Sequence, residues 1–110
     1  MTSQSRKHRG YATQRLLAER WRESGFAPHC HAIGAGEAGS DILDGPPGLE
    51  VEVKARAASM SLPAALRQAH ARADGVPIVV WRHPGQGPAT VGEWTVTMTL
   101  EDFEKLWARP

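Results

Sequence analysis

Cysteine and long hydrophobic runs are both scarce in this sequence of 110 residues. The single cysteine, Cys30, excludes an internal disulfide, because a disulfide requires two thiols. No stretch approaches the roughly eighteen consecutive apolar residues of a membrane-spanning helix, and the first ten residues lack the apolar segment of a secretory signal. We therefore expect a cytoplasmic protein that crosses no membrane.

No single residue class dominates the composition. Hydrophobic residues make up 41% of the chain and charged residues 23%, with no long tract of one residue type. These values are typical of ordinary globular proteins, and the length is close to that of one domain. We expect a single domain over residues 1–110, in which residues 1–9 form a basic flexible arm.

The formal net charge is only +1, but it is unevenly distributed along the chain. Residues 1–25 carry six Lys or Arg and two Asp or Glu, a charge of +4, which leaves −3 for the remaining residues. A basic segment beside a mildly acidic body is typical of proteins in which one region contacts phosphates and another holds a cation. A solvated helix with a loose basic tail would give the same pattern.

The first half of the sequence predicts a helix followed by three strands. Apolar residues at helical spacing predict a helix over 11–24, ended by Gly25 in a left-handed conformation. A strand is expected over 26–33. The segments 40–43 and 49–55, joined by the turn "DGPPG", are then expected to form a β-hairpin.

The second half predicts a helix, two strands and a short final helix. Ser61 is placed to cap a helix that ends at Gly75. The apolar run 76–81 is typical of a buried central strand, and 82–93 is expected to be a loop. Thr99 with Asp102 resembles the capping box of the last helix. Inward positions are expected, from strand 93–98, for Trp94, Val96 and Met98, and one side of the last helix carries Leu100, Phe103 and Trp107.

Two acidic residues and a lysine flank the "DGPPG" turn. In an extended strand Glu52 and Lys54 project from the same face, and the hairpin returns Asp41 toward them. Converging carboxylates suit Mg²⁺, which takes one or two of them and keeps waters for its substrate. A neighbouring lysine can then stabilise a phosphate or position the attacking water. The alternative is a solvated strand face with a surface ion pair, and a simple turn residue at position 41.

The same residues carry a family resemblance. "SD", followed eleven residues later by "EVK" and then by the helix "LPAALRQA", resembles the PD-(D/E)xK nuclease superfamily. The stretch "RKHRGYATQRLLAERWRESGF", a Gly-rich loop and "SDI" are similar to the N-terminal half of archaeal-type Holliday junction resolvases and their bacteriophage-encoded relatives. The resemblance covers roughly residues 6–82.

This resemblance implies a restriction-endonuclease-like α/β core of helix, three-stranded meander, helix and strand, here followed by a further strand and helix. It implies an enzyme that hydrolyses DNA phosphodiesters with Mg²⁺ or Mn²⁺. The substrate would be branched DNA, the enzyme would be a homodimer, and the cell would be bacterial or phage-infected. The metal-binding acids fall on Asp41 and Glu52, the main-chain carbonyl ligand on Val53, the catalytic lysine on Lys54 and the helix glutamine on Gln68.

Two positions depart from the family pattern. Ser40 replaces the proline of the superfamily name and offers a hydroxyl near phosphate. Gln14 stands where many of these resolvases carry a metal-binding glutamate, and its amide can accept from a metal-bound water. Glu19 lies largely on the opposite side of the helix and is a poor substitute. DNA contacts are expected from Arg6, Lys7, Arg9, Ser40 and Arg56.

Three functions stay open at this point. The first is a junction resolvase that acts as a dimer, with Trp81, Trp94 and Trp107 available for its interface. The second is a structure-nonselective nuclease for repair or phage DNA processing. The third is a catalytically degenerate DNA-binding module on the same fold, an option that Gln14 supports because it removes a carboxylate.

Overall fold

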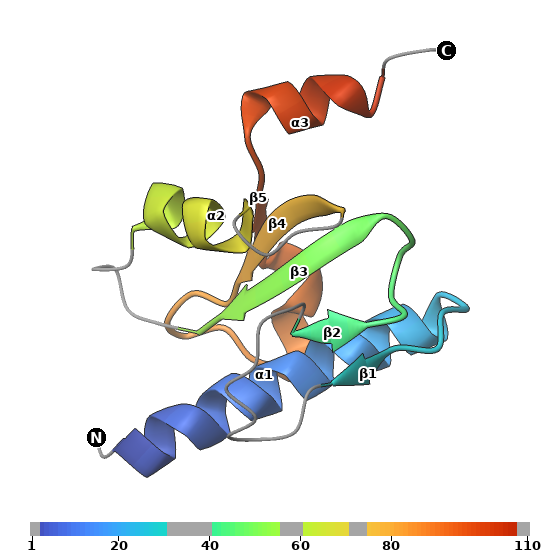
Figure 1. Ribbon diagram of the computed structural model, residues 1–110. Coiled ribbons are helices and arrows are strands. Elements are labelled where there is room, and N and C mark those ends of the chain that lie inside the picture. The colour runs from blue at the N-terminus through green and yellow to red at the C-terminus, as the bar shows by residue number, and fades with distance from the viewer. Residues whose placement is uncertain (1–2, 31–40, 56–60, 71–74, 108–110) are drawn as a thin grey trace.

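A mixed three-stranded sheet lies between two helices in the computed structural model (Figure 1), which describes residues 3–30, 41–55, 61–70 and 75–107. The strand order is β3 (Leu49–Lys54), β4 (Val76–Trp81) and β5 (Thr95–Thr97). β3 and β4 are parallel, joined by α2 (Leu62–His70), and β5 is antiparallel to β4. The α/β class expected from the sequence is confirmed.

Helices cover both faces of the sheet, which accounts for the continuous apolar run in β4. On one face, α1 (Ser3–Glu23) contributes Leu17 to a cluster that contains the inward residues of β3 and β4: Val51, Val53, Ile78 and Val80. On the other face, Ala65 and Leu66 of α2 pack against Val79. The buried central strand predicted at 76–81 is confirmed.

Helix α1 is longer than predicted at its start and ends as predicted. It begins at Ser3, so residues 3–9 are helical, whereas the sequence analysis places them in a flexible arm. Arg, Lys and Gln are good helix formers, which permits this extension. Gly25 has a φ of 101°, and Phe26 N–H donates to the Trp21 carbonyl at 3.1 Å. This is the Schellman motif of a left-handed glycine cap.

The predicted hairpin is only partly formed. β2 (Ile42–Leu43) makes its antiparallel ladder with β1 (His29–Cys30), and within the described residues it is not assigned to the sheet of β3. The link to β3 is a 2.7 Å hydrogen bond from Asp41 N–H to the Val51 carbonyl. The prediction of a regular β2–β3 ladder is therefore wrong, and a carboxylate replaces one of its carbonyls, as shown below. Of the expected strand 26–33, the last three residues lie outside the described residues.

The polar caps predicted in the second half are confirmed. Ser61 Oγ accepts from Ala64 N–H at 3.2 Å at the start of α2. The predicted end of this helix cannot be compared, since residues 71–74 lie outside the description. The expected loop 82–93 contains a 3₁₀ helix, η1 (Pro88–Glu93). Its start is fixed by Thr90, whose hydroxyl accepts from Gly87 N–H at 3.0 Å.

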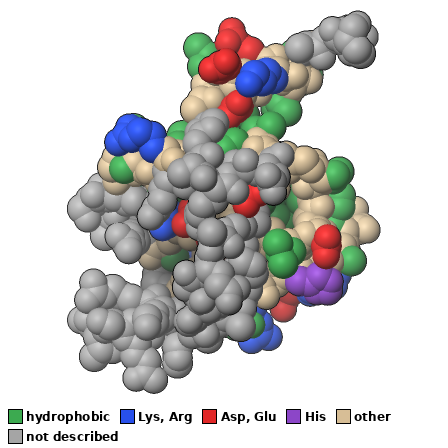
Figure 2. Space-filling model, in the orientation of Figure 1, with side chains coloured by type: hydrophobic (Ala, Val, Ile, Leu, Met, Phe, Trp, Pro, Cys, Tyr) green, Lys and Arg blue, Asp and Glu red, His purple; other side chains and the backbone are tan. Residues whose placement is uncertain are grey.

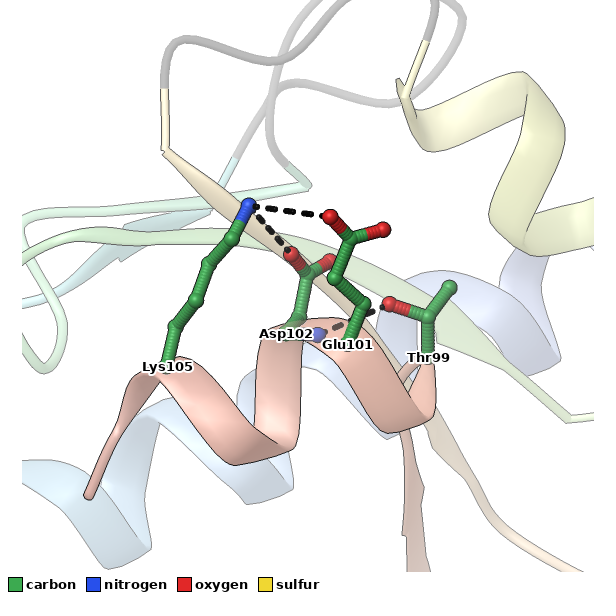
Figure 3. Close-up of polar contacts among 4 residues, drawn as sticks. All are labelled: Thr99, Glu101, Asp102 and Lys105. Carbon is green, nitrogen blue, oxygen red and sulfur yellow. Dashed lines mark hydrogen bonds and ion pairs between the residues drawn. The ribbon is translucent and has the colours of Figure 1, made fainter. Parts of the chain in front are cut away.

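The C-terminal helix α3 (Leu100–Lys105) projects beyond the end of β5, away from α1 (Figure 1). Thr99 Oγ1 accepts from Asp102 N–H at 3.1 Å, which confirms the predicted cap (Figure 3). Trp94 is buried as expected, but Val96 is 59% exposed. Its inward placement was wrong, because β5 is an edge strand paired with β4 alone. None of the described helices is both long and apolar enough to span a bilayer.

Candidate functional site

Glu52 and Lys54, both on β3, form a largely buried ion pair. Lys54 Nζ lies 3.2 Å from Glu52 Oε1, and the side chains are only 21% and 10% exposed, respectively. Glu52 is in register with Val79, whose side chain packs under α2, so Glu52 and Lys54 both project from the α2 face. This burial excludes the interpretation of Glu52 as a solvated surface residue. The pair was predicted from the i, i+2 spacing, but its burial was not.

Asp41 is held against β3 by its backbone and by its side chain. Its N–H donates to the Val51 carbonyl at 2.7 Å, and its Oδ2 accepts from Val53 N–H, also at 2.7 Å. A carboxylate that accepts from a backbone N–H has a fixed orientation and a strong, charge-assisted bond. The Asp41 carboxylate therefore lies beside the residue that separates Glu52 from Lys54.

The carbonyls of Val53 and Lys54 point to opposite edges of β3. The N–H and C=O of one residue in an extended strand point to the same edge. Because Val53 N–H meets Asp41, the Val53 carbonyl also points to the edge on which Asp41 lies. The Lys54 carbonyl points to the opposite edge, where it accepts from Arg82 N–H at 2.8 Å. Val53 thus presents an oxygen toward the side of the strand that carries Asp41, as a carbonyl ligand would require.

The pKa of the Cys30 thiol is affected by nearby charges, among them that of Asp41. Burial raises the pKa of Cys30 above its ordinary value of 9.0. The positive charges of Arg22 and Arg15 lower this pKa, and the negative charge of Asp41 raises it. The strand register agrees with the influence of Asp41, since Asp41 precedes Ile42, which pairs with Cys30 across the β1–β2 ladder.

Gln14 is half-buried on α1. Its Oε1 is buried without a hydrogen-bond partner. Leu17, one turn later, packs on the face of the sheet opposite to that of Glu52. The neighbouring Thr13 is fully buried, and its hydroxyl accepts from Arg82 at 3.1 Å. A role for Gln14 near a metal stays a prediction, and its unpartnered oxygen is the observation that bears on it.

The oxygen donors around β3 fit a hard divalent cation. Glu52 supplies a carboxylate and Val53 a carbonyl from β3, and Asp41, which precedes β2, supplies the second carboxylate. Mg²⁺ commonly binds through one or two carboxylates and retains several waters. Within the described residues, no three His, Cys, Asp or Glu side chains gather as a metal site. A cation here would therefore rely on two carboxylates, the carbonyl and water.

Several predicted site residues lie beyond what the structure describes. Ser40 and Arg56 fall outside the described residues. Four others belong to described helices, but their side chains are outside the description: Arg6, Lys7 and Arg9 in α1, and Gln68 in α2. The structure does place α2 over the face from which Glu52 projects.

Sequence reasoning missed Arg82, which follows β4 directly. Its Nε donates to the Gln86 carbonyl at 2.7 Å, and its guanidinium lies 5.8 Å from the Trp94 ring centroid. Together with its bond to Thr13, these contacts tie the carboxyl end of β4 to α1 and to the segment before β5. An arginine immediately after a buried strand was the available signal, because a cation there must find partners.

Comparisons of this chain with known protein families, with curated proteins and with solved structures find no match.

Proposed function

We propose that this protein is a metal-dependent DNA endonuclease with a restriction-endonuclease-like core, and that it acts on branched DNA as a Holliday junction resolvase. One observation carries the proposal. The Asp41 carboxylate accepts from the amide of Val53, the residue that separates the buried, ion-paired Glu52 and Lys54. A carboxylate, a carbonyl and a lysine of β3 thus lie on the strand that the carboxylate of Asp41 contacts.

In the proposed reaction, Asp41, Glu52 and the Val53 carbonyl hold Mg²⁺ or Mn²⁺. The bound cation supplies Lewis acidity at the phosphate. Lys54, already beside Glu52, orients the attacking water and offers its ammonium to the phosphate as negative charge develops. In-line attack leaves 5′-phosphate and 3′-hydroxyl ends. The proposal gives Gln68 and Gln14 supporting polar contacts at the edge of this site.

DNA binding in this proposal relies on phosphate contacts. Arg6, Lys7 and Arg9 lie in the first turns of α1 and would grip a duplex without reading its sequence. Ser40 and Arg56 flank the proposed site in the sequence and would contact the phosphate backbone beside it. Resolution of a four-way junction needs two symmetric incisions, so the proposal includes a homodimer with one site in each subunit.

Isosteric substitutions test the assigned carboxylates. Asp41→Asn and Glu52→Gln should each lower the cleavage rate by at least about 100-fold, the scale expected for losing a preorganised electrostatic group. The matched control for Asp41 is Asp44→Asn, which changes an exposed acid three residues later. The matched control for Glu52 is Glu50→Gln, which changes the acid two residues earlier on β3. Both controls should cut at near wild-type rates. Near-normal cleavage by folded Asp41→Asn and Glu52→Gln proteins would reject the site.

A catalytically degenerate DNA-binding module is the second candidate. The observation that favours it is the neutral side chain at Gln14, whose buried oxygen has no partner. Such a protein would bind DNA with a steep salt dependence but would cut no substrate under any divalent ion. A structure-nonselective nuclease differs from both in cutting linear duplex as readily as junctions.

A further inference from the structure

The C-terminal helix turns its apolar side away from the protein. Four large side chains form what we call the α3 surface: Leu100, Phe103, Leu106 and Trp107, which are 71%, 47%, 53% and 71% exposed. Phe103 and Trp107 make an edge-to-face contact with ring centroids 6.2 Å apart. Hydrophobic side chains are visible on the projecting helix at the top of Figure 2.

The opposite side of α3 is polar and carries ion pairs within the helix (Figure 3). Lys105 Nζ lies 3.7 Å from Asp102 Oδ1 and 3.9 Å from Glu101 Oε1. Asp102 is buried, whereas the large apolar residues of the same helix are exposed. This arrangement reverses the usual amphipathic placement, in which the apolar side faces the protein. The α3 surface is therefore available for contact with another molecule.

Charge identifies the class of partner. Three acids, Glu101, Asp102 and Glu104, accompany the single base Lys105 on α3. Such a helix repels nucleic-acid phosphates and anionic lipid headgroups, both of which select basic surfaces. Its exposed aromatic pair is of the type enriched in the cores of protein interfaces. A protein partner fits these properties.

The residue spacing makes the α3 surface self-complementary. Leu100 and Leu106 lie three positions before and three positions after Phe103. A two-fold axis that passes Phe103 pairs the two helices antiparallel and sets each Leu100 against Leu106 of the partner subunit. This isologous contact closes as a dimer instead of extending into a filament.

The area available matches a small dimer interface. At roughly 200 Å² for a large side chain, the exposed fractions of the four residues amount to about 500 Å² of apolar surface per subunit. Two copies supply about 1,000 Å², which is roughly the total area that a specific interface should bury at minimum. An apolar patch of this size is at the upper end for a monomer.

We propose that the α3 surface is the homodimer interface, formed by two antiparallel α3 helices around Phe103. This inference supplies the interface for the dimer in the proposed function, but it stands on exposure and spacing and does not require DNA cleavage. It also corrects the expected contributors. Trp94 is buried and Trp81, half-buried, stacks on His83 with centroids 4.0 Å apart, so only Trp107 of the three tryptophans is freely exposed.

Sedimentation equilibrium of the full-length protein tests the interface. The wild type should be a dimer at tens of micromolar, and the double variant Leu100→Ser with Phe103→Ser should be a monomer at the same concentration. The matched control is Leu43→Ser, which changes an apolar residue that is 43% exposed on β2 and should leave the dimer intact. Because all the changed side chains are exposed, thermal unfolding midpoints measured on dilute monomer should agree among the variants.

A crosslink tests the register. In a Cys30→Ser background, Phe103→Cys should form disulfide-linked dimers under mild oxidation, because residues on the two-fold axis approach closely. Glu101→Cys, on the polar side of the helix, should not. A monomeric wild type, a dimer that survives the double variant, or mass that grows beyond two subunits would overturn the inference. Cleavage assays on the same samples report the proposed chemistry separately, since a dimer may form with or without activity.

Discussion

Two of the carboxylate–lysine pairs among the described residues are closely spaced in sequence and differ in setting. Glu52 and Lys54 are two residues apart on β3, their charged atoms are 3.2 Å apart, and both side chains are largely buried. Asp102 and Lys105 are three residues apart on α3, at 3.7 Å, but this lysine is 62% exposed. The first pair lies under a helix beside Asp41, and the second belongs to a helix that projects into solvent. The comparison shows that closely spaced pairs can differ widely in burial, because burial depends on which elements pack around them.

The largest expected difference between Lys54 and Lys105 is in the rate of DNA cleavage after substitution. Lys54→Ala should lower the rate of DNA cleavage by at least about 100-fold, because it removes the cation proposed to orient water and meet the phosphate. Lys105→Ala should leave the rate near wild type. DNA binding by both variants, measured at fixed salt, should remain. Equal rates for the two variants would show that the buried pair has no special role in the reaction.

The same two variants should also differ, by a smaller factor, in their free energy of unfolding. Lys54→Ala should lower the free energy of unfolding by about 2–3 kcal/mol, somewhat less than the cost of breaking a fully buried pair. Lys105→Ala should cost no more than about 0.5 kcal/mol, as expected for a pair with an exposed partner. Urea denaturation, followed by circular dichroism, measures both. A cost for Lys105→Ala as large as that for Lys54→Ala would remove the distinction drawn from burial.

Gln14 offers a way to add a negative charge on α1 at the position where the family resemblance expects an acid. If its unpartnered oxygen faces the proposed metal, Gln14→Glu should keep or raise activity and lower the Mg²⁺ concentration at half-maximal cleavage by about 3- to 10-fold. The added charge should also make thermal stability depend more strongly on Mg²⁺. Glu19→Gln, an exposed change on the same helix, is the control. A titration shifted by Glu19→Gln but not by Gln14→Glu would show that the wrong residue of α1 is assigned.

Cys30 provides the smallest and most local test. Asp41 raises the pKa of the Cys30 thiol, so Asp41→Asn should lower it and speed alkylation at pH 8 by about two- to threefold, because more thiolate is present. Arg15→Gln should act in the opposite direction, since Arg15 lowers the same pKa. Timed reaction with iodoacetamide measures both. No change with Asp41→Asn would place that carboxylate away from β1.

The same shift predicts a pH dependence of stability. Folding raises the pKa of Cys30 above 9.0, so the neutral thiol is favoured in the folded state. The resulting stabilisation is complete below the ordinary pKa and is lost as the pH rises through the raised value. Cys30→Ser should therefore make the free energy of unfolding fall less steeply above pH 9. An unchanged slope would contradict the assigned shift.

Local chemistry made the element ends predictable. Gly25, Ser61 and Thr99 each act through residues within a few positions in the chain, and all three were correctly placed from the sequence. The apolar run of β4 likewise announces a strand covered on both faces. These features depend on the residues themselves and require no knowledge of distant neighbours.

The features that could not be predicted depend on which elements become neighbours. The alternation of β3 suggested a solvated charged face, but α2 covers that face and buries Glu52. Alternation also placed Val96 inward, although its strand is at the sheet edge. The bond from Val53 N–H to the Asp41 carboxylate replaces a ladder bond, and no pattern of spacing distinguishes a side-chain acceptor from a backbone one. The candidate residues were thus identified from the sequence, and their burial and contacts were supplied by the fold.

Cleavage of matched four-way junction, flap and linear duplex DNA by the wild-type protein tests the central claim most directly. The account predicts Mg²⁺- or Mn²⁺-dependent cutting of the junction, with paired symmetric incisions and binding at least about tenfold tighter than to linear duplex at moderate salt. Equal cutting of all three substrates would replace the resolvase with a nonselective nuclease. Binding without cutting of any substrate, under either divalent ion, would contradict the assignment of Asp41, Glu52 and Lys54 as a nuclease site.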